Sequence, residues 1–257
     1  MFVLFLSFIL LLSSCCTRSA LDENIQHTGL QNPESKDFSV AIDIGHTVKH
    51  PGVMGARGIG EFFFNQNLSV MLQTELSKKG YATSFIINPK GEDISLQDRT
   101  RIAKEKKADI LISLHHDSAQ PKYLSKWVVE GDTLFYSDEF QGYSLFYSEK
   151  STLPKESFRL ATLLGQSFRQ NHFRPTLHHA EAIDGENRPL IDKEKGVYRF
   201  DDLVVLKTST IPAVLIECGV LINRDEELLL TNPVYQRMLV LSIVQAIETF
   251  RMQQKKG

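Results

Sequence analysis

The chain has 257 residues and an apolar fraction of 42%, which suffices for one large α/β domain or two small domains with a sizeable core. Its 29 basic and 31 acidic residues are spread evenly and leave a formal net charge of −2. A chain of this charge pattern lacks the basic patch that nucleic-acid binding requires, so no nucleic-acid partner is expected.

The first 16 residues, MFVLFLSFILLLSSCC, form a short apolar run that ends in small residues. Such a run is typical of a signal peptide. Residues 12–15, LSSC, resemble the lipobox of bacterial lipoproteins, although no Lys or Arg precedes the run. We therefore expect an exported protein with a lipid anchor on Cys15, located at the periplasmic face of a membrane as an outer-membrane lipoprotein. An uncleaved membrane anchor is the alternative.

Residues 17–37 are polar and without periodicity, which indicates a flexible tether. The folded domain is expected to span residues 38–254. Cys218 is the only cysteine after the first 16 residues, so neither a disulfide framework nor a cysteine metal site is predicted.

From residue 38 onward, short apolar runs alternate with helical patterns, in which Gly80 and Ser95 are placed as caps and Leu96 is expected to face inward. This alternation predicts a single α/β domain with a mainly parallel central sheet flanked by helices. The predicted strands cover residues 38–44, 81–87, 108–114, 143–148, 203–206 and 211–217. The predicted helices cover residues 61–79, 96–107, 156–172 and 233–254.

Three of the most apolar predicted strands end in residues suited to metal or proton chemistry. The first leads to His46, the third leads to His115 and His116, and the last ends on Glu217. Because the carboxyl ends of parallel strands meet at one edge of a sheet, these side chains are expected to converge. The side chains of neighbouring residues on a strand point to opposite faces, so only one of His115 and His116 is expected to face the site. For the same reason, Cys218 should face away from the site if Glu217 faces it.

A glycine-rich loop, residues 52–60, joins His46 to Glu61 at the start of a predicted helix. Glycines permit tight reversals, so the loop can return Glu61 to His46, and the helix dipole favours a charged carboxylate there. The spacing of the glycines does not fit a phosphate- or dinucleotide-binding loop. Two histidines and one carboxylate are a recurrent ligand set for catalytic zinc, although each residue taken singly also fits a structural role.

Five motifs occur in the order found in a known family: AIDIGH, the loop ending in Glu61, ISLQDRTRIAKEKKADILISLHHDS, YSLFYS and LVVLKTSTIPAVLIECGVLINRDEE. Over residues 38–250 the chain resembles the zinc-dependent N-acetylmuramoyl-L-alanine amidases of the amidase 3 family, cell-wall hydrolases related to AmiC. The resemblance implies a phosphorylase/hydrolase-like fold, one Zn²⁺ bound by His46, Glu61 and His115, and Glu217 as the catalytic glutamate. Ile44 departs from the usual Pro-Gly-His motif without removing a ligand.

The resemblance further implies that zinc-activated water cleaves the amide bond between N-acetylmuramic acid and L-alanine of the peptidoglycan stem peptide. Glu217 would be the general acid and base. Peptidoglycan is the implied substrate, and a protein activator is a possible partner. Two alternatives remain, namely a zinc peptidase acting on stem peptides and a non-catalytic wall-binding adaptor on the same scaffold.

Arg99 also matches the family pattern, but a buried ion pair with a nearby acid is the simpler interpretation. The long segment 173–202 has no clear period and is a candidate lid. It contains a polar cluster for which three interpretations remain: a solvated loop, a lining of the substrate groove, or a cover over the zinc. The residues of this candidate substrate-binding cluster are His178, His179, Glu181 and Glu186.

Overall fold

The structure, a computed structural model, describes residues 37–254. The predicted signal peptide, the lipobox-like Cys15 and nearly all of the predicted tether lie outside these described residues. Within the described range, no helix combines the length and the apolar character needed to cross a bilayer.

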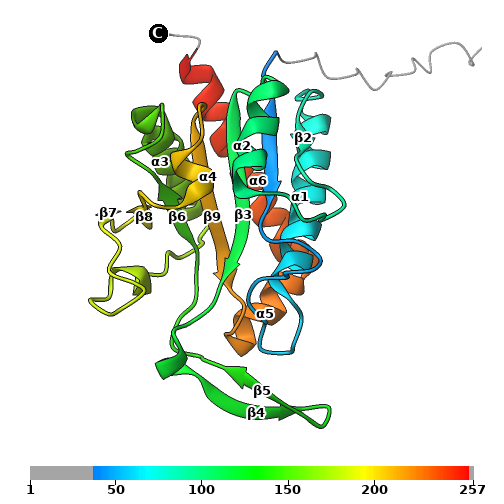
Figure 1. The fold of residues 1–257 in the computed structure, drawn as a ribbon, viewed down its shortest axis with the longest axis vertical. Coiled ribbons are helices and arrows are strands. Elements are labelled where there is room, and N and C mark those ends of the chain that lie inside the picture. The colour runs from blue at the N-terminus through cyan, green and yellow to red at the C-terminus, as the bar shows by residue number, and fades with distance from the viewer. Residues whose placement is uncertain (1–36, 255–257) are drawn as a thin grey trace, which may run out of the picture. The chain divides into compact units, whose positions relative to one another are not determined.

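A seven-stranded sheet with the strand order β2-β1-β3-β9-β6-β8-β7 forms the centre of the fold (Figure 1). Neighbouring strands are parallel except for the pairs β6 with β9 and β7 with β8. The prediction of a mainly parallel sheet flanked by helices is therefore confirmed. The strands are β1 (Val40–Ile44), β2 (Phe85–Ile86), β3 (Ile110–Asp117), β6 (Ser144–Tyr147), β7 (Leu190–Asp192), β8 (Val197–Arg199) and β9 (Ala213–Val220).

Within residues 37–254, six α-helices accompany the sheet. They are α1 (Glu61–Lys78), α2 (Leu96–Glu105), α3 (Pro154–Gln170), α4 (Val204–Lys207), α5 (Arg224–Thr231) and α6 (Pro233–Gln254). Alternate residues of the central strands face two separate cores. Ile42 and Ile112 belong to the core shared with α1, α3 and α6, whereas Ala41 and Leu111 belong to the core beneath α2 and α4. Burial on both faces explains why the strands have almost continuous apolar sequences.

The predicted helix caps are confirmed. The Ser95 hydroxyl accepts a hydrogen bond from the Asp98 backbone N–H at 3.0 Å, and Gly80 adopts a φ of 88° just after α1. Leu96 is an exception to the predicted inward face, because its side chain is 47% exposed in the first turn of α2. Its position at the helix start places it beyond the edge of the core.

The prediction of a strand over residues 203–206 is wrong, because this segment lies in the single helical turn α4. The Lys207 backbone N–H donates to the Leu203 carbonyl at 2.9 Å, and Leu206 is fully buried in the core beneath α2. Periodicity cannot separate a short buried strand from a buried helical turn. Here packing against α2 decides between them.

Other differences concern the extent of the strands. The strand predicted over residues 81–87 is reduced to β2, and β9 continues past Glu217 to Val220. The second part of the segment 173–202 contributes β7 and β8 to the sheet, so it is not a lid throughout. The sequence interpretation missed α5 and a separate antiparallel hairpin of β4 (Ser125–Val129) and β5 (Asp132–Tyr136).

Arg99 forms the buried ion pair that the simpler interpretation predicted. Its Nη1 lies 2.7 Å from Asp43 Oδ1, and the Ser113 hydroxyl donates to the other Asp43 oxygen at 2.7 Å. Arg99 also donates to the backbone carbonyls of Ile44 and His46, the latter at 2.8 Å. This one side chain therefore attaches α2 to the carboxyl end of β1.

We expect Arg99→Ala to lower the free energy of unfolding by about 3–5 kcal/mol, because it leaves the Asp43 carboxylate buried without its counter-ion. Urea unfolding followed by circular dichroism measures the loss. Lys150→Ala, which removes the solvent-exposed pair between Lys150 and Asp202, is the control and should leave the unfolding midpoint almost unchanged. A loss below about 1 kcal/mol for Arg99→Ala would contradict the assignment.

Candidate metal centre

His46 follows β1 in a backbone conformation that is uncommon for a residue with a side chain. Its φ is 69°, in the left-handed region, which usually favours glycine. The Gly45 backbone N–H donates to the Leu114 carbonyl at 2.9 Å, and Arg99 holds the His46 carbonyl. These contacts fix the turn, and non-glycine residues held in this way cluster at functional sites.

The glycine-rich loop returns Glu61 to His46, as the sequence predicted. Backbone hydrogen bonds close the loop, with the Glu61 N–H donating to the Val53 carbonyl at 2.9 Å. Gly52 has a φ of 78°, and a Cβ atom there would collide with the Glu61 carboxylate and the His46 ring. Only glycine therefore allows the loop to pass this close to the two side chains.

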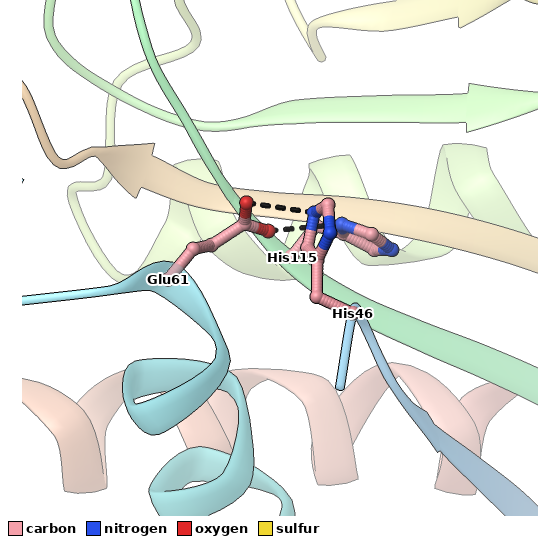
Figure 2. Close-up of side chains that lie close together, drawn as sticks. All are labelled: His46, Glu61 and His115. Carbon is pink, nitrogen blue, oxygen red and sulfur yellow. Dashed lines mark hydrogen bonds and ion pairs between the residues drawn. The ribbon is translucent and has the colours of Figure 1, made fainter. Parts of the chain in front are cut away.

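His46, Glu61 and His115 meet at the carboxyl ends of β1 and β3 (Figure 2). His46 Nε2 lies 2.8 Å from Glu61 Oε2, and His115 Nδ1 lies 2.9 Å from Glu61 Oε1. Glu61 is buried, whereas both histidines are partly exposed. Two ring nitrogens and a carboxylate that converge within 4.8 Å of one another fit a divalent metal ion with access from solvent.

The Glu61 carboxylate is held in place by further hydrogen bonds. Asn65 Nδ2 donates to Oε1 at 3.0 Å, and the His116 backbone N–H donates to the same oxygen at 3.1 Å. Burial alone raises the pKa of the Glu61 carboxyl, but hydrogen bonds and charge from His115 and His46 outweigh it, so this pKa lies well below its usual range. Glu61 is therefore a carboxylate at neutral pH.

The side chains of His115 and His116 point to opposite faces of the sheet, as expected for neighbouring residues of a strand. The His116 ring turns toward α1, where its Nδ1 lies 2.7 Å from Asn65 Oδ1. Burial lowers the pKa of His116 to about 4, so it is a neutral residue that supports the Glu61 position through Asn65. Asn65 was missed by the sequence interpretation, although it lies one helical turn after Glu61.

Glu217 pairs with His115 across β3 and β9 and lines the same cavity as His46. This cavity of about 700 Å³ lies between the starts of α2 and α4, above the carboxyl ends of the central strands. Glu217 Oε2 is buried and has no hydrogen-bond partner within residues 37–254. Burial, reinforced by the charges of Asp117 and Glu61, raises the pKa of Glu217 well above its usual value. Cys218 points away into the core, as predicted.

His178, His179 and Glu186 do not line this cavity. Both imidazoles are buried, and both approach Asp117, the last residue of β3. Glu186 binds the far side of His179. The sequence interpretation missed Asp117, although it lies two residues after His115 and so carries a strand-alternation signal.

Residues 40–249 match the model of the amidase 3 family, described as N-acetylmuramoyl-L-alanine amidase. The chain belongs to this family. The resemblance inferred from the motifs AIDIGH, ISLHHDS and AVLIECG is thereby confirmed.

Among curated proteins, this amidase 3 chain is 27% identical over 232 residues to the probable N-acetylmuramoyl-L-alanine amidase AmiB of Haemophilus influenzae. That alignment covers 83% of this chain and 52% of the relative, so the chain spans about half of the relative's length. A putative N-acetylmuramoyl-L-alanine amidase of Buchnera aphidicola is 24% identical, with 84% of this chain and 98% of the relative covered.

Solved structures share the fold. An N-acetylmuramoyl-L-alanine amidase from Clostridium difficile 630 superposes with a TM-score of 0.66 at 24% identity, covering 88% of this chain and all of that one. The CwlD amidase from Clostridioides difficile, solved in complex with the GerS lipoprotein, superposes with a TM-score of 0.63 at 19% identity. The alignment covers 84% of this chain and 99% of the CwlD chain.

We expect Gly45→Ala to weaken metal binding by about 10-fold or more, because a Cβ atom would lie 2.5 Å from His115 Cε1 and displace the ring. Competition with a chromophoric chelator measures the affinity. Gly131→Asn at the tip of the β4–β5 hairpin is the control, since it has open space around it and asparagine tolerates its positive φ. Equal affinities for the two variants would contradict the arrangement.

Proposed function

We propose that the protein is a peptidoglycan amidase that hydrolyses the bond between N-acetylmuramic acid and L-alanine of the stem peptide. One observation carries this proposal: a cluster of His46, Glu61 and His115 opens onto a cavity that also contains Glu217. Membership of the amidase 3 family supports it.

The proposed cofactor is Zn²⁺, held by His46, Glu61 and His115. Two imidazole nitrogens and one carboxylate oxygen are ligands that Zn²⁺ accepts, and three protein ligands leave a position for water or substrate. When bound, zinc polarises a carbonyl group and lowers the pKa of its water to about 7. The chain supplies the ligand geometry, since Asn65 and the His116 backbone N–H hold the Glu61 carboxylate through hydrogen bonds.

Glu217 is the proposed general acid and base. It lines the cavity beside His115, and burial together with the charges of Asp117 and Glu61 holds the pKa of its carboxyl above the usual value. A raised pKa is typical of carboxyl groups that act in general acid-base catalysis. Its proposed role is to take a proton from the attacking water and to deliver it to the departing L-alanine amine. The absence of a hydrogen-bond partner for Oε2 within the described residues leaves that oxygen available for this transfer.

The cavity walls suggest how substrate is received. Leu203, Val204 and Leu215 line the cavity with apolar groups, while His50 and Asp93 contribute polar groups. The proposed substrate combines a sugar and a peptide, and a wall of this mixed character suits it. No residue of the segment 173–202 lines the cavity, which does not favour a groove-lining or covering role for His178, His179 and Glu186.

We further propose export, with a lipid anchor on Cys15 at the outer membrane and action in the periplasm. The apolar N-terminus and the LSSC motif support this location. A protein activator is also part of the proposal, and the complex of the related CwlD with a lipoprotein is the observation that supports such a partner.

A zinc peptidase and a wall-binding adaptor remain the competing functions. The adaptor is disfavoured because the chain retains all three candidate ligands together with Glu217. The peptidase differs only in the bond that is cleaved. Mass spectrometry of digested peptidoglycan separates the two, since an amidase releases free stem peptides beginning with L-alanine and a peptidase leaves shortened peptides on the glycan.

We expect Glu217→Gln to lower amidase activity by about 10²- to 10⁴-fold while metal content stays the same. The amide keeps the size of the side chain but cannot take up the proton. Released stem peptides are quantified by mass spectrometry, with the exposed Glu139→Gln as the matched control. Full activity in Glu217→Gln would refute the proposed role of this residue.

Chelation should abolish the activity, and Zn²⁺ should restore it, because removing the ion leaves water without an activating group. The full-length protein is treated with 1,10-phenanthroline, freed of chelator and returned to Zn²⁺, with Mg²⁺ as the matched ion. Release of stem peptides that continues unchanged in the metal-free protein would exclude metal-assisted hydrolysis. Restoration by Mg²⁺ alone would exclude zinc as the required ion.

A further inference from the structure

A second cluster of metal-ligating side chains lies beyond the first site along β3. Asp117 is the last residue of β3, and His178 and His179 come from a short 3₁₀ turn in the segment 173–202. The cluster shares no residue with His46, Glu61 and His115, and the function proposed above does not use it.

The two imidazoles aim their Nε2 atoms at one carboxylate oxygen. His179 Nε2 lies 2.7 Å and His178 Nε2 lies 3.2 Å from Asp117 Oδ2. All three atoms are buried, and none is aligned in a hydrogen bond with any described residue. Three buried polar atoms that converge without hydrogen bonds are uncommon, because leaving such groups unsatisfied is costly.

The opposite ring nitrogens are held by a second layer of polar groups. His178 Nδ1 lies 2.8 Å from the Thr176 hydroxyl, and His179 Nδ1 lies 2.9 Å from Glu186 Oε2. Glu186 is itself fixed by Gln120 Nε2 at 2.7 Å. A histidine that binds a metal through one nitrogen usually donates its other N–H to a carboxylate or another oxygen, and this pattern is present twice here.

A simple ion pair accounts less well for the arrangement. A protonated His179 would pair with both Asp117 and Glu186, but this pairing leaves His178 Nε2 without an aligned hydrogen bond. Protonating His178 as well would place two positive rings with centroids 4.1 Å apart in a buried site. Phe140 stacks on His178 at 4.6 Å and Phe146 meets His179 edge-on at 5.0 Å, so aromatic rings, not water, surround the pair. One cation shared by three lone pairs removes both the ring repulsion and the unsatisfied atoms.

We propose that Asp117, His178 and His179 form a second site for a divalent transition-metal ion of the Zn²⁺ class. Two histidines and one aspartate provide the nitrogen and oxygen donors that such ions prefer. The ion attaches the turn carrying His178 and His179 to the end of β3, beside the strand that carries Glu217. It therefore has a structural role, while the first ion serves the chemistry.

The test counts bound ions in the full-length protein, purified in detergent, stripped of metal, loaded with Zn²⁺ and desalted. Elemental analysis should give two zinc ions for the wild type and one each for His178→Asn and His46→Asn. The double variant should hold none. His172→Asn, which removes an exposed histidine at a positive φ that asparagine tolerates, is the matched control and should hold two.

A milder variant keeps the test valid if His178→Asn does not fold. Glu186→Gln retains a hydrogen-bond acceptor for His179 but removes its charge, and we expect about 10- to 100-fold weaker binding of one of the two ions. Circular dichroism establishes that each variant is folded. A single ion in the wild type that His46→Asn abolishes would overturn the second site. Two ions of unchanged affinity in folded Glu186→Gln would also overturn it.

These outcomes are independent of the proposed amidase activity, because ion counts do not require turnover. If the wild-type protein binds two ions but releases no stem peptides, only the proposed function is contradicted. If the wild-type protein binds one ion and releases stem peptides, only the second metal site is contradicted.

Discussion

The parallel register of β1, β3 and β9 is the constraint on which the site depends. Ile44 pairs with Leu114, and His115 pairs with Glu217, so the three strands place their functional residues at one edge of the sheet. A slip of one residue would turn each side chain to the opposite face. The apolar cores on both sides of the sheet prevent such a slip, because it would exchange the residues that face α1 with those that face α2.

Four carboxylates lie within or beside this edge, and their surroundings divide them into two kinds. Asp43 is paired with Arg99, Glu61 faces two imidazoles, and Asp117 faces two more. Glu217 has no such partner, and its pKa is raised by burial and by its acidic neighbours. A buried carboxyl without a hydrogen-bond partner is costly, and its raised pKa makes Glu217 a candidate for a functional role.

Local sequence patterns predict which residues form the first site. Strand alternation and the glycine loop suffice to bring His46, Glu61 and His115 together, and family resemblance then selects His115 over its neighbour. The β4–β5 hairpin was missed because its turn is Glu130–Gly131, whereas two-residue hairpin turns are usually recognised by Asn-Gly or Asp-Gly. The turn α4 was missed because its conformation depends on packing against α2, which a single sequence does not contain.

The end of β3 shows why the second cluster could not be derived in the same way. Between the pairs His115–Glu217 and Asp117–Val220 the register shifts, so that two steps along β3 face three along β9. The extra residue of this bulge lies in β9, and bulges are common beside active sites. The partners of Asp117 are His178 and His179, which come about 60 residues later in the chain. This is a long-range contact that no local pattern encodes.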